Sequence, residues 1–417
     1  MKTHENTLQA VKTHENINAM GQRGFTIIEL MISLMLGLLI MAGISQIFIT
    51  SKTSYSHEDA SARAQEGGRF SMEFIASDIR MAGYLGCNSS LDSATNNATP
   101  PDSGNQSLSA GLRGFTYIGA GGTGAATDWD PPLPAELIDG QVEPWTDVIT
   151  IQYASSYGVS LTGNMATDDA NIQINPNTEF RANVKVDDIL MVADCSNADI
   201  FRVTSISNGA GKTTITHTVS GAVGNDDPKL GAKYGMDAEL MRLVSHIYYI
   251  GRPDYDGDGA PDINALPALQ RLEYQSGQLV TVPVVEGIEK MRILFGRDTN
   301  QDANSNINTP DTYNTATEVN VAVPLGGTLA DGTSICAIGA GCPDWGRVAA
   351  VRLGFISVSE NEGDATPDTN IYHLLGDHRP ASSGGDFDDY GPATPNGYGT
   401  NSRRRRIAFT STVQLRN

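Results

Sequence analysis

One long apolar run dominates the pattern of hydrophobic and polar residues along the chain. Residues 25–51 carry a single charged side chain, that of Glu29, in 27 positions. At a rise of 1.5 Å per residue, a helix of this length crosses the roughly 30 Å hydrocarbon core of a bilayer. The pattern therefore predicts a transmembrane helix near the amino terminus of a single-pass membrane protein.

The helix is expected to continue beyond the membrane, because residues 52–82 contain no proline. Apolar residues recur there at helical spacing and predict one buried face: Phe70, Phe74, Ile75, Ile79 and Ala82. Gly67 and Gly68 each weaken a helix by about 1 kcal/mol, so a break at this point is an alternative. The whole helix is expected to span residues 25–83.

The remainder of the chain has the pattern of a β-rich protein. Residues 88–145 are rich in Gly, Asn, Ser and Pro, which predicts a long loop region with short strands at most. Strands are predicted at 148–153, 189–193, 200–206, 213–219, 240–250, 271–274, 279–282, 290–295, 348–357 and 407–415. Because strands and helices do not alternate, antiparallel pairing is favoured. We therefore expect an α+β fold, in which the long helix carries a large antiparallel, β-rich globular head at 84–417.

The excess of acidic over basic residues limits the kinds of molecule that the protein can bind. Acidic residues number 48 and basic residues 28, which gives a net charge of −20. A protein that binds the phosphates of nucleic acid needs a cationic face, so this balance argues against a nucleic-acid partner. The basic run at 403–406 lies directly before the last predicted strand, and we expect it to pair with acidic loops.

Motifs of catalysis are missing from the sequence. The segment Gly-Ala-Gly-Lys-Thr at 209–213 lacks the first glycine of a phosphate-binding loop, because Ile206 stands in its place. Both of its flanks have strand character, so a hairpin turn is predicted there. Neither HExxH nor GxSxG occurs. We therefore expect no enzymatic activity.

The residues in front of the apolar run distinguish it from an ordinary secretory signal. Such a signal has a small-residue cleavage site after its apolar region, whereas here Gly24 lies before it. Glu29 is also unusual, because a carboxylate at membrane depth costs a few kcal/mol and marks a functional position. Both residues indicate a processed, functional segment.

These residues, Gly24 followed by Phe-Thr-Ile-Ile-Glu-Leu at 25–30, resemble the class III signal of type IV prepilins. The resemblance implies that residues 1–24 are a leader, which a prepilin peptidase removes between Gly24 and Phe25. It also implies methylation of the new amino group of Phe25. Glu29 would then balance the charge of that amino group, in a pairing between neighbouring subunits during assembly.

Five further fragments resemble the PilW family of minor pilins: 78–87, 188–201, 285–298, 345–353 and 409–417. The resemblance implies a minor pilin that initiates assembly of a type IV pilus or belongs to its tip complex, with roles in twitching motility and adhesion. Other minor pilins, the major pilin and the prepilin peptidase are the implied partners. The helix would lie in the inner membrane with the head in the periplasm, and later in the extracellular pilus, or fimbrium. A minor pseudopilin of type II secretion is the nearest alternative.

The four cysteines lie downstream of the membrane segment, in an oxidising compartment, and predict two disulfides. Cys336 and Cys342 would close a short glycine-rich loop, which leaves Cys87 to pair with Cys195. Such a bridge would fasten the end of the helix to the head. A zinc site is the alternative, although no CxxC or neighbouring pair of histidines supports it.

A calcium site is predicted in an acidic loop with carboxylates at every second residue: Asp254, Asp256, Asp258 and Asp262. Hard oxygen ligands at this spacing suit Ca²⁺, with Gly259 at the sharp turn. Ala265 replaces the closing glutamate of an EF-hand-like loop, so a bidentate ligand must come from elsewhere. A solvated acidic turn is the alternative reading.

A second loop has the same spacing with less charge and no glycine: Asp298, Asn300, Asp302 and Asn304. An Asx-rich turn is favoured over calcium there. Together the two loops suggest another class of function, a calcium-dependent adhesin displayed on the pilus.

Overall fold

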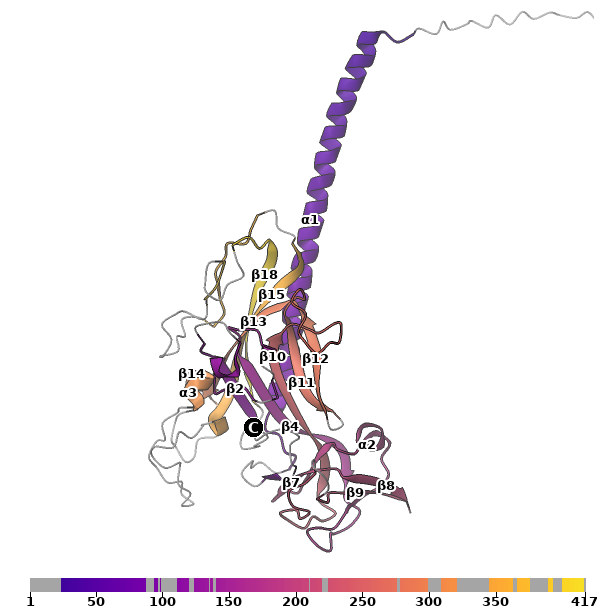
Figure 1. Cartoon of the computed structure of the whole chain (residues 1–417), viewed down its shortest axis with the longest axis vertical. Helices are drawn as coiled ribbons and strands as arrows, with labels where there is room; N and C mark the ends of the chain where they lie inside the picture. Colours follow the sequence, from indigo (N-terminus) through magenta and orange to yellow (C-terminus); the bar gives the residue numbers. More distant parts are fainter. Residues whose placement is uncertain are drawn as a thin grey trace, which may run out of the picture. The chain divides into compact units, whose positions relative to one another are not determined.

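The computed structural model describes residues 24–87, 94–96, 98, 111–119, 124–134, 136–137, 140–209, 211–219, 224–275, 278–298, 309–320, 345–362, 366–375, 389–392 and 400–415 (Figure 1). Its contacts divide the chain into two compact units, Met1–Tyr55 and Ser56–Asn417, and each is described by itself. The fold is α+β, as predicted: a long helix near the amino terminus and a large set of mainly antiparallel sheets.

Helix α1 (Ile27–Met81) runs for 55 residues without a break. In the first unit its apolar side chains are exposed, with Ile27 at 83% and Leu38 at 70%. Among the described residues it is the one helix long and apolar enough to cross a membrane. An apolar surface of this extent fits a bilayer or a bundle of similar helices, in agreement with the predicted membrane anchor.

In the second unit α1 buries a single face: Ala60, Ala64, Gly68, Ser71, Ile75, Ala76, Asp78 and Ile79. The predicted burial of Ile75 and Ile79 is confirmed. The prediction is wrong for Phe70 and Phe74, which are 38% and 48% exposed. Phe70 follows Gly68 by two residues, or about 200° around the helix, so it points away from the face on which the sheets pack.

Gly67 and Gly68 do not break α1, and Gly68 instead allows close packing against the helix. A Cβ atom on Gly68 would lie 2.1 Å from the ring of Phe409, in strand β18 (Arg404–Gln414). A Cβ atom on Gly67 would lie 3.4 Å from Ser357 Oγ, which is an ordinary contact. Only the missing side chain of Gly68 therefore lets the Phe409 ring reach the helix backbone.

Strand β10 (Glu239–Gly251) is the centre of a nine-stranded sheet. One edge of β10 pairs with β4 (Val148–Ser160) along most of its length. The other edge pairs with β6 (Ile189–Ala193) near its start and with β11 (Ala268–Gln275) near its end. The sheet has the order β1-β7-β6-β10-β4-β2-β3, with β12 beside β11. Its remaining strands are β1 (Ala94–Asn96), β2 (Leu112–Tyr117), β3 (Trp129–Asp130), β7 (Ala198–Arg202) and β12 (Gln278–Glu286).

Three smaller sheets complete the second unit. The first has four antiparallel strands: β14 (Thr312–Asn314), β13 (Ile288–Arg297), β15 (Val348–Glu362) and β18. The second is β5 (Ile172–Ile174), β9 (Lys212–Thr216) and β8 (Ser205–Gly209), and the third is β16 (Tyr372–His373) with β17 (Asp389–Tyr390). Gly209 and Lys212 face each other at the β8–β9 turn, so the predicted hairpin is confirmed. The short helices are α2 (Thr178–Asn183), α3 (Ala316–Asn320), η2 (Ala126–Asp128) and η3 (Trp345–Arg347).

The main core lies where α1 meets the two largest sheets. Ile75 and Ile79 pack there with Ile151 of β4, Leu269 of β11 and Phe355 of β15, all buried. A second core lies beneath the three-stranded sheet and includes the fully buried Phe180 and Phe201. Because one face of α1 is part of the main core, packing against the sheets also determines which side chains of α1 are exposed in this unit.

Buried charges also link the two largest sheets. The carboxylate of Asp147, just before β4, lies 2.8 Å from the Arg292 guanidinium in β13 and accepts the backbone N–H groups of Tyr117 and Ile293. Lys290 is buried beside this pair. Burial, helped by the charge of Arg292 and opposed by Asp147, lowers the pKa of Lys290 to about 7.

We predict that Gly68→Ala destabilises the head, even though alanine favours helix over glycine by about 1 kcal/mol. The new methyl group meets the Phe409 ring, and overpacking of this kind costs about 1–3 kcal/mol. Gly67→Ala is the matched control and should be neutral or stabilising. Urea denaturation of a fragment starting at Ser56 measures both, and Phe409→Leu should restore stability to the Gly68→Ala variant. Equal stabilities of the two alanine variants would contradict the proposed contact.

We further predict that the free energy of unfolding of the head rises from pH 7 to pH 9. The unfolded chain keeps the Lys290 proton up to its ordinary pKa, whereas the folded chain releases it near pH 7. The unfolded state therefore binds more protons in this window, and one such group contributes at most about 1.4 kcal/mol per pH unit. Urea titrations at pH 7, 8 and 9 should show this slope in the wild type and in Lys185→Met, an exposed control. A Lys290→Met variant with an unchanged slope would refute the assignment.

Candidate assembly segment and metal loop

The predicted processing site lies directly in front of α1. Gly24 and Phe25 precede the first helical residue, and Phe25 is 81% exposed. A Cβ atom on Gly24 would have no other residue within 4 Å. The peptide bond between Gly24 and Phe25 is therefore uncovered by the described part of the chain. Residues 1–23, which make up nearly all of the predicted leader, lie outside the described residues.

Glu29 occupies a defined position in the first turn of α1. Its backbone N–H donates to the Thr26 hydroxyl at 3.3 Å, so Thr26 caps the helix and Glu29 is the third residue after the cap. The pair has the threonine-to-glutamate spacing of a capping box. A carboxylate in this turn is also favoured by the positive end of the helix dipole. The role of Thr26 was not predicted from the sequence, although its spacing from Glu29 is a recognised helix-start signal.

Removal of the predicted leader would place two complementary charges at one end of the helix. Cleavage would create an amino group at Phe25, one residue before the Thr26 cap. The Glu29 carboxylate is the only acidic group between there and the end of the apolar run. The segment can therefore supply both a cation and an anion to a helix bundle that contains little water.

A disulfide joins Cys87 to Cys195, as predicted from the sequence. It links the segment just after α1 to the turn between β6 and β7, 108 residues along the chain, with Cα atoms 4.7 Å apart. Two sulfurs bonded to each other are not thiolate ligands, which removes both residues from the alternative zinc site. Cys336 and Cys342 lie outside the described residues, and their pairing stays a prediction.

The acidic loop between β10 and β11 brings three carboxylates together. Oxygen atoms of Asp254, Asp256 and Asp258 lie within 4.8 Å of one another, and all three residues are exposed. Asp262, the fourth predicted ligand, is not in this group. Its carboxylate accepts the backbone N–H of Tyr255 at 2.8 Å. The loop thus offers a triad that can hold a cation.

Backbone hydrogen bonds shape this triad. Asp254 accepts the N–H groups of Gly259 and Gly257, which lower the pKa of its carboxyl group. Both glycines have positive φ, of 88° and 75°, which explains why the turn carries glycine at these positions. The N–H of Asp258 lowers the pKa of Asp256, but the charges of Asp258 and Asp262, the loss of solvent and the hydrogen bond with Asp254 together raise it by more. A bound cation would relieve that repulsion.

The second acidic loop is described only at its start. Asp298 follows β13 and is buried, with its backbone N–H donating to the Arg347 carbonyl group at 3.2 Å. Asn300, Asp302 and Asn304 lie outside the described residues. The favoured Asx-rich turn and the calcium alternative at this loop therefore both stay predictions.

A buried polar cluster at the end of α1 was not anticipated from the sequence. The Asp78 carboxylate accepts hydroxyl groups of Tyr153 and Tyr248, at 3.0 and 2.6 Å, and lies 2.6 Å from Nδ1 of His246. Nε2 of His246 lies 3.2 Å from Glu273. Burial raises the pKa of Asp78, but the hydrogen bonds and the histidine lower it by more. The cluster fixes the last turn of α1 against β4, β10 and β11.

Two protein-family models match the chain, one near its amino terminus and one over its carboxyl-terminal part. Residues 19–45 match the family model of the prokaryotic N-terminal methylation motif, which includes Gly24, Phe25 and Glu29. Residues 247–417 match the model of type IV pilus-assembly protein W, PilW, from the end of β10 through β18. No curated protein and no solved structure matches the chain. The two family matches, together with the long apolar helix, support a type IV pilus-related pilin that carries a PilW domain in its carboxyl-terminal part.

Proposed function

We propose that this chain is a minor pilin of a type IV pilus that takes part in initiation of assembly or in the tip complex. The observation that carries the proposal is the methylation motif at the start of a free apolar helix, on the same chain as a PilW domain. The head from Ser56 onward is large. A large head is hard to accommodate at many stacked positions of a shaft, which favours the tip.

In this proposal the chain has a structural role and catalyses no reaction. Prepilin peptidase removes the leader at Gly24, and the amino group of Phe25 is then methylated. The apolar half of α1 stays in the inner membrane until assembly transfers it into the filament, with the head on the periplasmic side. The transfer costs little, because membrane and filament core are both apolar. Neighbouring minor pilins and the major pilin are the partners, and twitching motility is a process that the pilus would serve.

A second candidate function is calcium-dependent adhesion by the head. It is favoured by the convergence of Asp254, Asp256 and Asp258 on one exposed loop. Carboxylate oxygens at this separation suit Ca²⁺, which accepts six to eight oxygen ligands in flexible geometry. Water and backbone carbonyl groups would complete the shell. An adhesin and a minor pilin are compatible roles for one chain.

We predict that the mature chain begins with methylated Phe25. Mass spectrometry of protein from sheared pili should find this residue at the amino terminus, and Gly24→Glu should leave the precursor uncut. Glu29→Ala is the matched variant: it should be cut and inserted normally but enter pili at least tenfold less, because the Phe25 amino group loses its counter-charge. An intact leader in assembled pili would overturn the pilin proposal. Recovery in a secretion pseudopilus instead of a pilus would favour the type II secretion alternative.

We predict that millimolar Ca²⁺ raises the melting temperature of the head relative to chelator. Binding to the folded loop alone stabilises it by about 2.7 kcal/mol when Ca²⁺ is at 100 times its Kd. Mg²⁺ should do less, since it requires a smaller octahedral cage. Asp256→Ala should remove most of the effect, whereas Asp302→Ala should remove little. Calorimetry that detects neither binding nor a shift would identify the loop as a solvated turn and remove the support for adhesion.

A further inference from the structure

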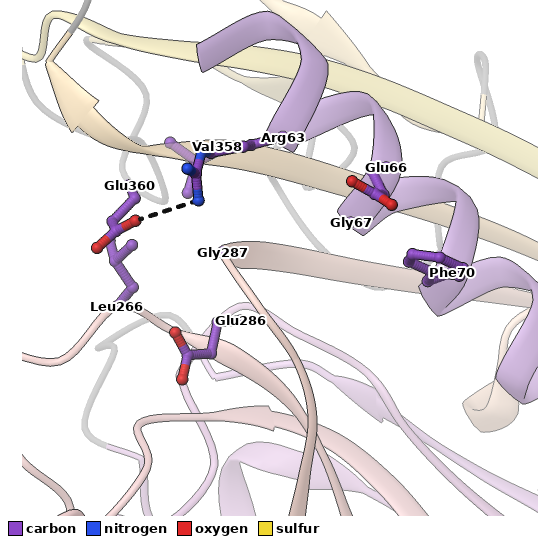
Figure 2. A pocket seen from close by; sticks show the side chains of 9 residues that line it. All are labelled: Arg63, Glu66, Gly67, Phe70, Leu266, Glu286, Gly287, Val358 and Glu360. Carbon is purple, nitrogen blue, oxygen red and sulfur yellow. Dashed lines mark ion pairs between the residues drawn. The ribbon is translucent and has the colours of Figure 1, made fainter. Parts of the chain in front are cut away.

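The second unit contains a pocket of about 250 Å³ beside residues 63–70 of α1. Figure 2 shows it between the helix, the end of β12 and the end of β15. Three carboxylate residues from three different elements line it: Glu66 of α1, Glu286 of β12 and Glu360 of β15. Sequence separation hides this convergence, so the pattern along the chain did not predict it.

The charges around the pocket are unbalanced. Arg63 is the one basic residue in the lining, facing three glutamates. It is 62% exposed and also engages Asp59 at 3.0 Å, while its contact with Glu360 is 4.0 Å. Glu286 accepts the hydroxyl group of Tyr255. The side chain of Glu66 makes no hydrogen bond or ion pair with any residue that the structure describes. The lining therefore attracts cations.

The shape of the pocket restricts the class of cation. Its walls include the apolar side chains of Phe70, Leu266 and Val358. Gly287 has a φ of 75°, and a Cβ atom there would lie 2.6 Å from the Val358 carbonyl oxygen, so only glycine allows this close approach of β15 at the pocket wall. A hydrated metal ion would leave the apolar walls unused. A lysine or arginine side chain fits both features, because an aliphatic stem leads to its charged end.

The position of the pocket points to the source of that side chain. Phe70 belongs both to the lining and to the exposed face of α1, where Phe74 continues the apolar surface one turn further. We infer that the pocket receives a lysine or arginine side chain of a neighbouring pilin subunit, with the exposed phenylalanines covered by the same neighbour. This inference rests on the proposed role as a pilus subunit.

The test uses the full-length chain in cells that assemble pili. Glu286→Lys with Glu360→Lys should be processed and inserted normally but fall at least tenfold in sheared pili, because two cations now repel the incoming one. The neutral pair Glu286→Gln with Glu360→Gln should fall less. Asp169→Lys with Asp227→Lys is the control of equal charge change at exposed positions outside the pocket, and should incorporate like the wild type.

A photoreactive residue at Leu266 provides a second readout that does not depend on the stability of the lysine variant. In assembled pili it should cross-link to a pilin peptide containing lysine or arginine, and the yield should fall when the two glutamates are changed to glutamine. Wild-type incorporation of the lysine pair, or cross-links only to lipid, would overturn the pocket inference alone. Absence of the wild-type chain from pili would overturn the proposed function and this inference with it.

Discussion

The second unit depends on close packing of α1 against the sheets. This packing is possible because Gly68 has no side chain. Gly68 lets the Phe409 ring of β18 contact the helix backbone. One turn and two turns further on, Ser71 and Ile75 are buried on the same face. Since a helix has a fixed angular step, burial of this face determines which residues face outward. The exposure of Phe70 and the pocket beside it follow from this orientation of α1 about its own axis.

The Asp78 cluster sets the same rotation by a different kind of interaction. Its carboxylate accepts two tyrosine hydroxyl groups and engages His246, all from strands far away in sequence. An acidic group this well buried is tolerable only with several hydrogen-bond partners, so the helix has one orientation that satisfies it. The disulfide from Cys87 then restrains the chain immediately after the helix. Packing, polar pairing and a covalent bond thus act together within about twenty residues of one another.

Features that depend on local residue patterns, or on cysteines lying on the same oxidising side of the membrane, could be predicted from the sequence. The apolar run, the antiparallel strands, the turn at Gly209 and the Cys87–Cys195 bridge belong to this class. Prediction failed where distant segments decide the outcome. An exposed glycine and a glycine under an aromatic ring look alike in a sequence, so the break considered at Gly68 did not occur. The outward position of Phe70 and the partners of Asp78 were hidden for the same reason. In the acidic loop, three of the four predicted carboxylates lie together, whereas Asp262 lies outside this group and accepts the backbone N–H of Tyr255.

The acidic loop and the pocket are physically connected, which gives their charges a common effect. The Tyr255 hydroxyl, from within the loop, donates to Glu286 at the pocket. Burial, the hydrogen bond to Glu286 and the charge of that carboxylate raise the pKa of Tyr255 to about 12. The backbone N–H of the same residue donates to Asp262. A cation that orders the loop would therefore also hold Tyr255 and, through it, Glu286. Electrostatics would nonetheless make calcium binding and the docking of a cationic side chain oppose each other, because each reduces the negative potential that attracts the other.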